Sequence, residues 1–556
     1  MKSREKIGPI QALILIGTLL TSVLITPSFS SEPVDLPKMF ILSLVGFVIL
    51  GLLFDLPRSL LLKSRTLLYS LVAFLCFMLT TLVFSGAPFN QQFFGTSGRN
   101  TGFLSYFALI IYMLAAALNV NHKFVKNLIY VLIFTGSANV LYGILQITKH
   151  DPIKWNNPYN PIIGFLGNPD FASAFIGLSS VAGVSFIFWN KINWFKKFLI
   201  AIVEVIALII IVKSKAQQGV IVFLIGSFLV ILIWIIKNKN VPKFILSFYL
   251  FLSTLVGAIV LMGIFKIGPL AQTLYKVSVR QRGFYWHAAI RMLNDKPLYG
   301  VGLDSYGDNY LAARSANAAK YSLTTQSNAA HNVFLDIASN GGYPLFLSYL
   351  AITFFALYRA IKAIREMEGF DPYFITLFAA WVGYQAQSVI SINQLGLAVW
   401  GWVLGGTLIG FSYIGANNSV ENSKRTRKAR IVSGRNQGKY LIVALTSIIG
   451  IAMALPPLIA DRNYRLAFAT RDLNKVIVAT RAYPEDTQRT LTAAEAIANS
   501  KLPEQALSLA KHVIEINPKN YNGWLLISRL SNPGSPDFLL ATSKLKLQNP
   551  FDSSRK

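Results

Sequence analysis

Long apolar segments alternate with short polar connections along most of the chain. A helix that crosses a bilayer needs about 20 predominantly apolar residues, and about 12–13 segments meet this requirement. The expected spans lie at 8–26, 36–54, 66–84, 101–119, 124–147, 171–189, 196–212, 217–236, 244–266, 332–358, 373–390, 395–413 and 440–460. The pattern therefore predicts an all-α, polytopic membrane protein in which residues 1–460 form the transmembrane domain.

Basic residues recur in every second connection between the expected spans. The clusters lie at 58–65, 123–126, 191–197, 237–243, 359–365 and 424–439. Because connections rich in Lys and Arg stay in the cytoplasm, these clusters and the N-terminus are expected on the cytoplasmic side. The intervening connections, the long polar loop 267–331 and the chain after 460 then lie outside the cytoplasm.

Composition supports the membrane interpretation. Only 14% of the residues are charged, against about 25% in soluble domains. The net charge of +28 would suit a nucleic-acid partner, but the basic residues form short clusters rather than one patch. We therefore expect membrane lipids, and not nucleic acid, as partners. The single cysteine, Cys76, lies in an apolar run and excludes a disulfide within the chain.

Residues 461–556 are polar, rich in alanine and helical in their spacing. Turns around Pro484, Pro518 and Pro550 recur about every 32–34 residues. Together with Ala506, this spacing resembles a short array of tetratricopeptide repeats, and a plain helical bundle is the alternative. Either arrangement predicts an extracytoplasmic helical tail that binds a protein partner.

The long outer loop carries most of the candidate chemistry. Residues 280–294 have the spacing of an amphipathic helix, with Trp286 on the apolar side. Arg282 lies near the start of this helix, where free backbone N–H groups attract anions, and its planar fork fits phosphate oxygens. Arg282 and Arg280 are therefore candidate phosphate ligands, with contact to lipid headgroups as the alternative.

His331 directly precedes the next expected span. The positive end of that helix disfavours the imidazolium form and keeps the ring neutral. A neutral histidine at a dry membrane edge can act as a general base. The alternative is a histidine that caps the helix or lies in the membrane interface.

Other outer cations extend this set. Lys213 and Lys215 lie at the outer end of a span and Arg99 lies in an outer connection, on the side that normally lacks basic residues. An anionic ligand would explain them, as would lipid headgroups. Glu204 lies inside a span and is a functional candidate by default, although no partner for it is evident.

The outer loops contain no pattern typical of a metal or nucleotide site. Carboxylates such as Asp170 form no Asp-x-Asp pair, and no His-x-x-His or Gly-rich Lys-Ser/Thr motif occurs there. ATP is also absent outside the cytoplasm. We therefore expect chemistry without metal, nucleotide or other cofactor.

The order of residues in this region resembles the core of the O-antigen ligase and polymerase superfamily. The matching features are Arg282, Trp286, the turn Gly300-Val301-Gly302, the pair His331-Asn332 and Gly342. The earlier outer segment GFLGNPDFA, which contains Asn168 and Asp170, is also similar to that family. The likeness covers roughly 85–410.

The resemblance implies a bacterial membrane glycosyltransferase of the GT-C type. Such enzymes move a glycan from an undecaprenyl-diphosphate carrier to a hydroxyl of a glycolipid, a growing glycan or a protein, at the outer face of the cytoplasmic membrane. It implies that His331 is the general base and that Arg282 holds the diphosphate. The remaining predicted site residues, which would support the site, are Arg99, Asn168, Asp170, Gly300, Gly302 and Asn332.

The chain departs from the family at one position. A second arginine usually lies in a Ser-Arg-Gly-like motif at the outer end of a span, where this chain reads KSKAQQG at 213–219. Lys213 or Lys215 would replace it, and a lysine supplies charge without the planar fork.

The expected function is therefore O-antigen ligase-like transfer. A polysaccharide polymerase and a protein O-oligosaccharyltransferase are alternatives within the superfamily. A flippase or transporter would need polar residues along a path through the spans, often with inverted repeats; the expected spans hold few charges and no evident repeat. A membrane anchor that displays a repeat scaffold would leave the loop 267–331 without a role.

Overall fold

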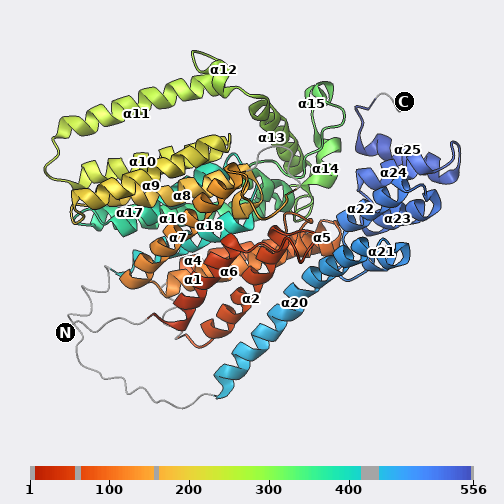
Figure 1. The fold of residues 1–556 in the computed structure, drawn as a ribbon, viewed down its shortest axis with the longest axis horizontal. Coiled ribbons are helices and arrows are strands. Elements are labelled where there is room, and N and C mark those ends of the chain that lie inside the picture. Colours follow the sequence, from red (N-terminus) through yellow and green to blue (C-terminus); the bar gives the residue numbers. More distant parts are fainter. Residues whose placement is uncertain (1–6, 57–63, 156–161, 415–436, 553–556) are drawn as a thin grey trace.

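A computed structural model describes residues 7–56, 64–155, 162–414 and 437–552, and every regular element in those ranges is a helix (Figure 1). Each range expected to cross the membrane contains one. These helices are α1 (Pro9–Val23), α2 (Asp35–Leu53), α4 (Arg65–Phe84), α6 (Phe103–Leu118), α7 (His122–Ile147), α8 (Pro169–Ile187), α9 (Trp194–Lys213), α10 (Gln217–Lys237), α11 (Lys243–Ile264), α16 (Val333–Glu366), α17 (Pro372–Ser388), α18 (Leu395–Phe411) and α20 (Gln437–Thr470).

Within the described ranges, eight of these helices are long and apolar enough to cross a membrane: α2, α4, α7, α8, α10, α11, α16 and α20. Helices α1, α6 and α18 are apolar but shorter. The all-α, multi-pass character is therefore confirmed. The larger number of about 12–13 spans stays a prediction.

The centre of the bundle is packed closely. Trp400 of α18 is fully buried, donates its indole N–H to Ser22 Oγ at 2.8 Å and meets the ring of Phe175 edge to face. Helices α8 and α10 approach so closely that a Cβ on Gly177 would lie 2.4 Å from the Gly219 carbonyl oxygen. Small residues of this kind allow helices to associate by packing where lipid supplies no hydrophobic drive.

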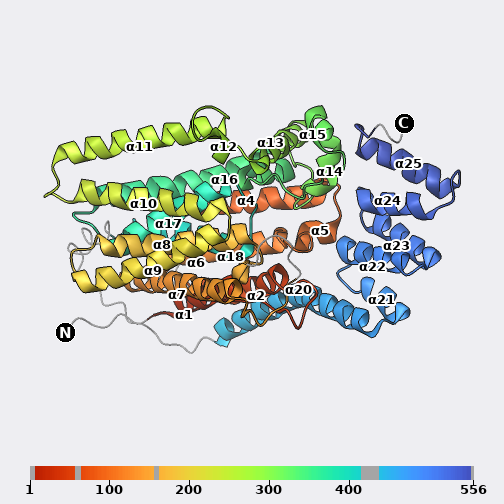
Figure 2. The same cartoon turned by 45° about the horizontal axis from the view of Figure 1, so that its top comes forward.

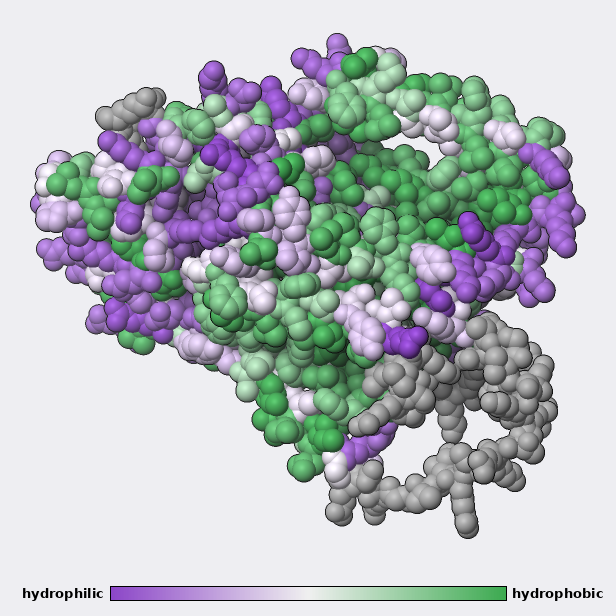
Figure 3. Space-filling view, turned by 180° about the vertical axis from the view of Figure 1, so that it is seen from behind, coloured by the Kyte–Doolittle hydropathy of each residue, from purple (hydrophilic) through white to green (hydrophobic). Residues whose placement is uncertain are grey.

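The polar loops collect at one end of the bundle (Figures 1 and 2). This end contains α5 (Phe89–Phe94), α12 (Ala271–Leu274), α13 (Val277–Asp295), α14 (Tyr306–Ala313) and α15 (Ala316–Tyr321). The basic connection between α10 and α11 lies at the opposite end. Figure 3 shows apolar side chains over the middle of one face and hydrophilic ones toward both ends.

This arrangement agrees with the orientation predicted from the charged connections. The basic residues within 57–63 and 415–436 lie outside the described residues. The side of the membrane on which each end lies stays a prediction.

The tail continues directly from the last membrane helix. Helix α20 runs through the expected domain boundary at 460, and α21 (Leu473–Thr480), α22 (Thr487–Asn499), α23 (Pro503–Ile516), α24 (Tyr521–Leu530) and α25 (Pro536–Gln548) follow. The tail helices pack on their neighbours in sequence around a separate core that includes Leu509, Val513, Trp524 and Ile527. The tail is helical as expected, whereas its kinship to tetratricopeptide repeats stays a prediction.

Candidate functional site

The helix expected at 280–294 is present as α13. Its buried side, which includes Ala288, Ala289 and Met292, packs against tyrosines of α14 in a small core of its own. The hydroxyl of Tyr306 donates to the Tyr285 carbonyl at 2.9 Å. This core fixes α13 beside the start of α16.

His331 lies just before α16, in contact with α13. Its ring stacks on Tyr285, with centroids 5.3 Å apart and planes inclined by 28°. The side chain of Asn332 caps α16 by accepting from the Leu335 N–H at 3.1 Å. The backbone of His331 is left-handed, with φ 52°, so the cap and the turn together direct this residue.

Three features of the structure lower the pKa of His331. Burial lowers its pKa most, and the nearby positive charges of Arg282 and Arg99 lower it further, to about 4. The imidazole is therefore neutral at neutral pH. The sequence predicted neutrality from the helix start alone, whereas burial and the two arginines produce it here.

Arg282 lies one turn before Tyr285 on the same helix. Burial lowers its pKa, and the negative charge of Asp170 opposes that shift, but a guanidinium remains charged. Its Nε and the indole Nε1 of Trp286 are buried and have no hydrogen-bond partner among the described residues. Both atoms only donate, so a ligand that accepts hydrogen bonds would satisfy them.

The turn at 300–302 fits into a break in α16. Gly342 has φ 75° inside that helix, and the freed carbonyls of Ser339 and Asn340 accept from the Val301 and Gly302 N–H groups at 2.9 and 3.0 Å. Within a membrane helix, non-helical backbone is tolerated only where protein buries it or it lines a water-filled cavity. Gly300, with φ 62°, allows this approach because a Cβ there would lie 2.3 Å from the Asn340 carbonyl carbon.

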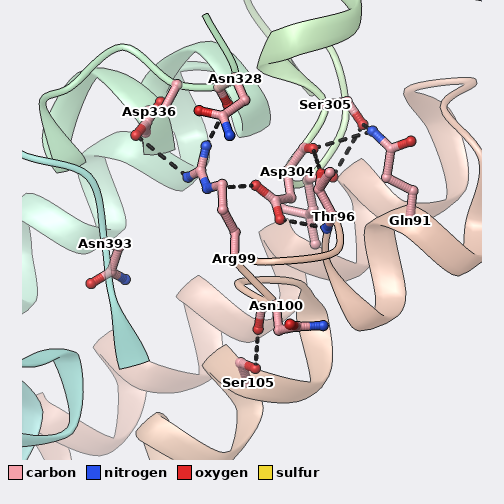
Figure 4. A network of polar contacts seen from close by, with 12 residues as sticks. Gln91, Thr96, Arg99, Asn100, Ser105, Asp304, Ser305, Asn328, Asp336 and Asn393 are labelled. Carbon is pink, nitrogen blue, oxygen red and sulfur yellow. Dashed lines mark hydrogen bonds and ion pairs between the residues drawn. The ribbon is translucent and has the colours of Figure 1, made fainter. Parts of the chain in front are cut away.

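Arg99 lies at the centre of a polar network (Figure 4). Its guanidinium is buried, 3.4 Å from Asp304 and 3.7 Å from Asp336, and donates to the Asn328 carbonyl. Asp336 also accepts from the Ala330 N–H at 2.7 Å. The network joins the connection near 99 to the segment before His331, and Arg99 is already paired with two carboxylates.

A buried lysine supports the outer segment at 164–170. Lys38 of α2 is fully buried and donates to the carbonyls of Leu24 and Phe165, each at 2.8 Å. Asn168 caps α8 by accepting from the Asp170 N–H at 2.8 Å. Sequence reasoning missed Lys38, although a lysine inside an apolar run was a usable signal.

The other predicted cations lie on the surface. Arg280 is exposed, and its guanidinium lies 4.2 Å from the ring centroid of Tyr321. Lys213 and Lys215 are exposed at the C-terminal end of α9. Their roles as phosphate ligands stay predictions. In the part of the chain that the structure describes, no group of three or more His, Cys, Asp or Glu residues could hold a metal ion.

A comparison with known families identifies the central part of the chain. Residues 202–350 match the model of the O-antigen ligase family, so this part is a domain of that family. The matched range extends from α9 into α16 and contains both Arg282 and His331. The resemblance drawn from the sequence is thereby confirmed for this region. No curated protein matches the chain.

Proposed function

We propose that this chain transfers a glycan from an undecaprenyl-diphosphate carrier to an acceptor hydroxyl at the outer face of a bacterial cytoplasmic membrane. The O-antigen ligase domain implies a lipid-linked glycan as substrate. The observation that carries the proposal is a neutral histidine, His331, held beside the cation Arg282 within this domain.

In the proposed reaction the acceptor hydroxyl gives its proton to the neutral ring of His331. Its oxygen forms a bond to the anomeric carbon of the glycan as the bond from that carbon to the diphosphate oxygen breaks. The electron pair leaves with the lipid diphosphate, whose developing charge Arg282 stabilises. A displacement of this kind inverts the anomeric configuration.

The electrostatics of the site link donor binding to base strength. A pKa of about 4 makes free His331 a weak base, since a general base works best with a pKa near the operating pH. An anionic diphosphate beside Arg282 offsets the positive charge that lowers this pKa. Donor binding then strengthens His331 as a base just when the acceptor must be deprotonated.

The chain lacks the second arginine of the family, so other cations must help Arg282 to hold the donor diphosphate. Lys213 and Lys215 would attract the diphosphate as point charges, without bidentate geometry. Arg282 then provides the directional contact. The unpartnered Nε of Arg282 and the indole N–H of Trp286 are buried donors that the diphosphate could accept from.

Transfer by purified full-length protein tests the proposal. The donor is undecaprenyl-diphosphate glycan from the source cells, EDTA is present, and a glycolipid, a glycan and a hydroxyl-bearing peptide are offered as acceptors. We expect His331→Ala to reduce transfer to background and Arg282→Ala to reduce kcat/KM by about 10²–10³-fold.

His287→Ala and Arg291→Ala are matched controls, because both residues are exposed on α13. These variants are expected to keep activity within about twofold of wild type. Transfer that survives loss of His331 would remove it as the base. A wild-type protein that transfers no glycan to any acceptor would overturn the proposed function.

A further inference from the structure

His331 forms part of the wall of a cavity between the outer loop and the tail. The cavity has a volume of about 430 Å³, within the range of about 300–1,000 Å³ that small-ligand sites occupy. Tyr285, Gln326 and Asn328 line it from the outer loop, and Gln488 and Asn522 line it from the tail. The tail thus reaches to the candidate base.

The tail side of this cavity is anchored to the loop side. Arg314 of the outer loop is fully buried and donates to the side chain of Asn549 at 2.8 Å. Lys519 donates to Asn309 at 2.9 Å. The ring of Tyr521 packs on the core between α13 and α14. These contacts make the tail a wall of fixed position rather than an incidental neighbour.

The charge of the cavity excludes the diphosphate as its ligand. No lysine or arginine occurs among the described residues that line it, and its ionisable groups are Asp304, Asp308, His331 and two tyrosines. A diphosphate needs cations. Arg282, which holds the diphosphate in the proposed reaction, is not among the lining residues, so the cavity is left for the second substrate.

The lining instead suits a neutral ligand rich in hydroxyl groups. Eight of the eighteen lining residues carry side-chain amides, and each amide offers both donors and an acceptor. Tyr285 and Tyr521 also line the cavity, and a tyrosine combines apolar surface with a polar tip. Vicinal hydroxyls and the apolar face of a sugar ring complement this combination.

We propose that the C-terminal tail completes the acceptor site and that the cavity binds a neutral carbohydrate acceptor with a hydroxyl directed at His331. This inference rests on the proposed function. It makes the tail a substrate-binding part of the enzyme. Donor and acceptor then meet His331 from opposite sides, the donor from the membrane and the acceptor from the tail.

Binding in the absence of donor tests the cavity without turnover. The probes are neutral oligosaccharides released by mild acid from the surface polysaccharide of the source cells, measured by saturation-transfer NMR with full-length protein. Gln326, which lines the cavity from the loop, donates to Asn522, which lines it from the tail, at 2.9 Å. We expect Gln326→Ala and Asn522→Ala to weaken binding at least tenfold, whereas Asn499→Ala, an exposed amide outside the lining, leaves it unchanged.

Competition identifies the ligand class. Inorganic pyrophosphate and a serine-rich peptide should each fail to displace the oligosaccharide. Displacement by either, absence of oligosaccharide binding, or wild-type binding by both cavity variants would overturn the proposal. Monodisperse elution of every variant keeps misfolding from imitating a loss of binding.

Transfer kinetics separate this inference from the proposed function. In the cavity variants we expect the KM for the carbohydrate acceptor to rise about tenfold while the KM for the donor stays within about twofold. Transfer with an unchanged acceptor KM would overturn the cavity assignment alone. Oligosaccharide binding without any transfer would overturn the proposed function and leave the carbohydrate site standing.

Discussion

The charge state of His331 depends on its burial and on two arginines from different parts of the chain. Burial, Arg282 on α13 and Arg99 in an early outer connection all lower its pKa. The sequence predicted a neutral histidine because a helix starts directly after it. The sequence could not predict that Arg99 lowers the pKa of His331, because Arg99 and its carboxylate partners Asp304 and Asp336 are distant in sequence and come together only in the fold.

The low pKa of His331 predicts an unusual acid limb. For the free enzyme, kcat/KM for the donor should stay nearly constant from pH 8 to about 5 and fall as pH approaches 4. Arg282→Ala should raise the pH at which its residual activity falls, because the substitution removes a positive charge that lowers the pKa of His331. A wild-type limb centred near pH 6.5 would contradict the buried, arginine-flanked environment.

The same shift affects stability. Because the pKa in the folded protein lies below the ordinary value of 6.5, the unfolded chain takes up the proton first as the pH falls. The contribution of His331 is therefore constant above pH 6.5, and stability is lost between about pH 6.5 and 4. Thermal unfolding of wild type and His331→Ala at pH 7.5 and 5 measures this contribution. The variant should lose less stability than wild type when the pH is lowered.

At the scale of elements, hydrophobic periodicity located the helices but not their interruptions. Every range expected to cross the membrane contains a helix, because a long apolar run in lipid has few other ways to satisfy its backbone. The break in α16 depends on a second segment, 297–302, which supplies hydrogen bonds to it. Within α16 itself, only the local sequence Gly341-Gly342-Tyr343-Pro344 indicates a break in the helix.

The break in α16 predicts a sensitive glycine. At Gly342 a Cβ would lie 2.6 Å from the Pro297 carbonyl oxygen, in a backbone conformation with φ 75°. Gly342→Ala should destabilise the protein by about 1–3 kcal/mol and lower the midpoint of thermal unfolding. Gly369→Ala is the matched control, since a Cβ there meets nothing within 4 Å. Equal midpoints for the two variants would contradict this account of the break.

At the scale of the whole molecule, the site extends beyond the recognised domain. Residues 202–350 match the family model, yet Gln91, Gln488 and Asn522 also line the cavity beside His331. The sequence predicted a helical tail on the same side of the membrane as the loop. It gave no sign that the two dock, because polar side chains such as Arg314 and Asn549 pair without any periodic pattern.

The predicted orientation can be tested in intact cells. In a Cys76→Ala background, Asn499→Cys should react with a membrane-impermeant maleimide. Lys239→Cys, in the connection between α10 and α11, should react only after the membrane is permeabilised. Both positions are exposed; Asn499 ends α22, and α22 and the connection between α10 and α11 lie at opposite ends of the molecule (Figure 1). The reverse labelling pattern would place the site in the cytoplasm and contradict the proposed donor geometry.

Helix α20 connects the acceptor wall mechanically to the bilayer. It is a single element of 34 residues, which at about 1.5 Å per residue spans about 50 Å and exceeds the hydrocarbon thickness of about 30 Å. A membrane helix adjusts its tilt to the thickness of the surrounding lipid. Because the tail continues from α20 and is also bound to the loop that holds His331, a change in the tilt of α20 would load these contacts, and membrane composition would thereby adjust acceptor affinity without any change in the sequence.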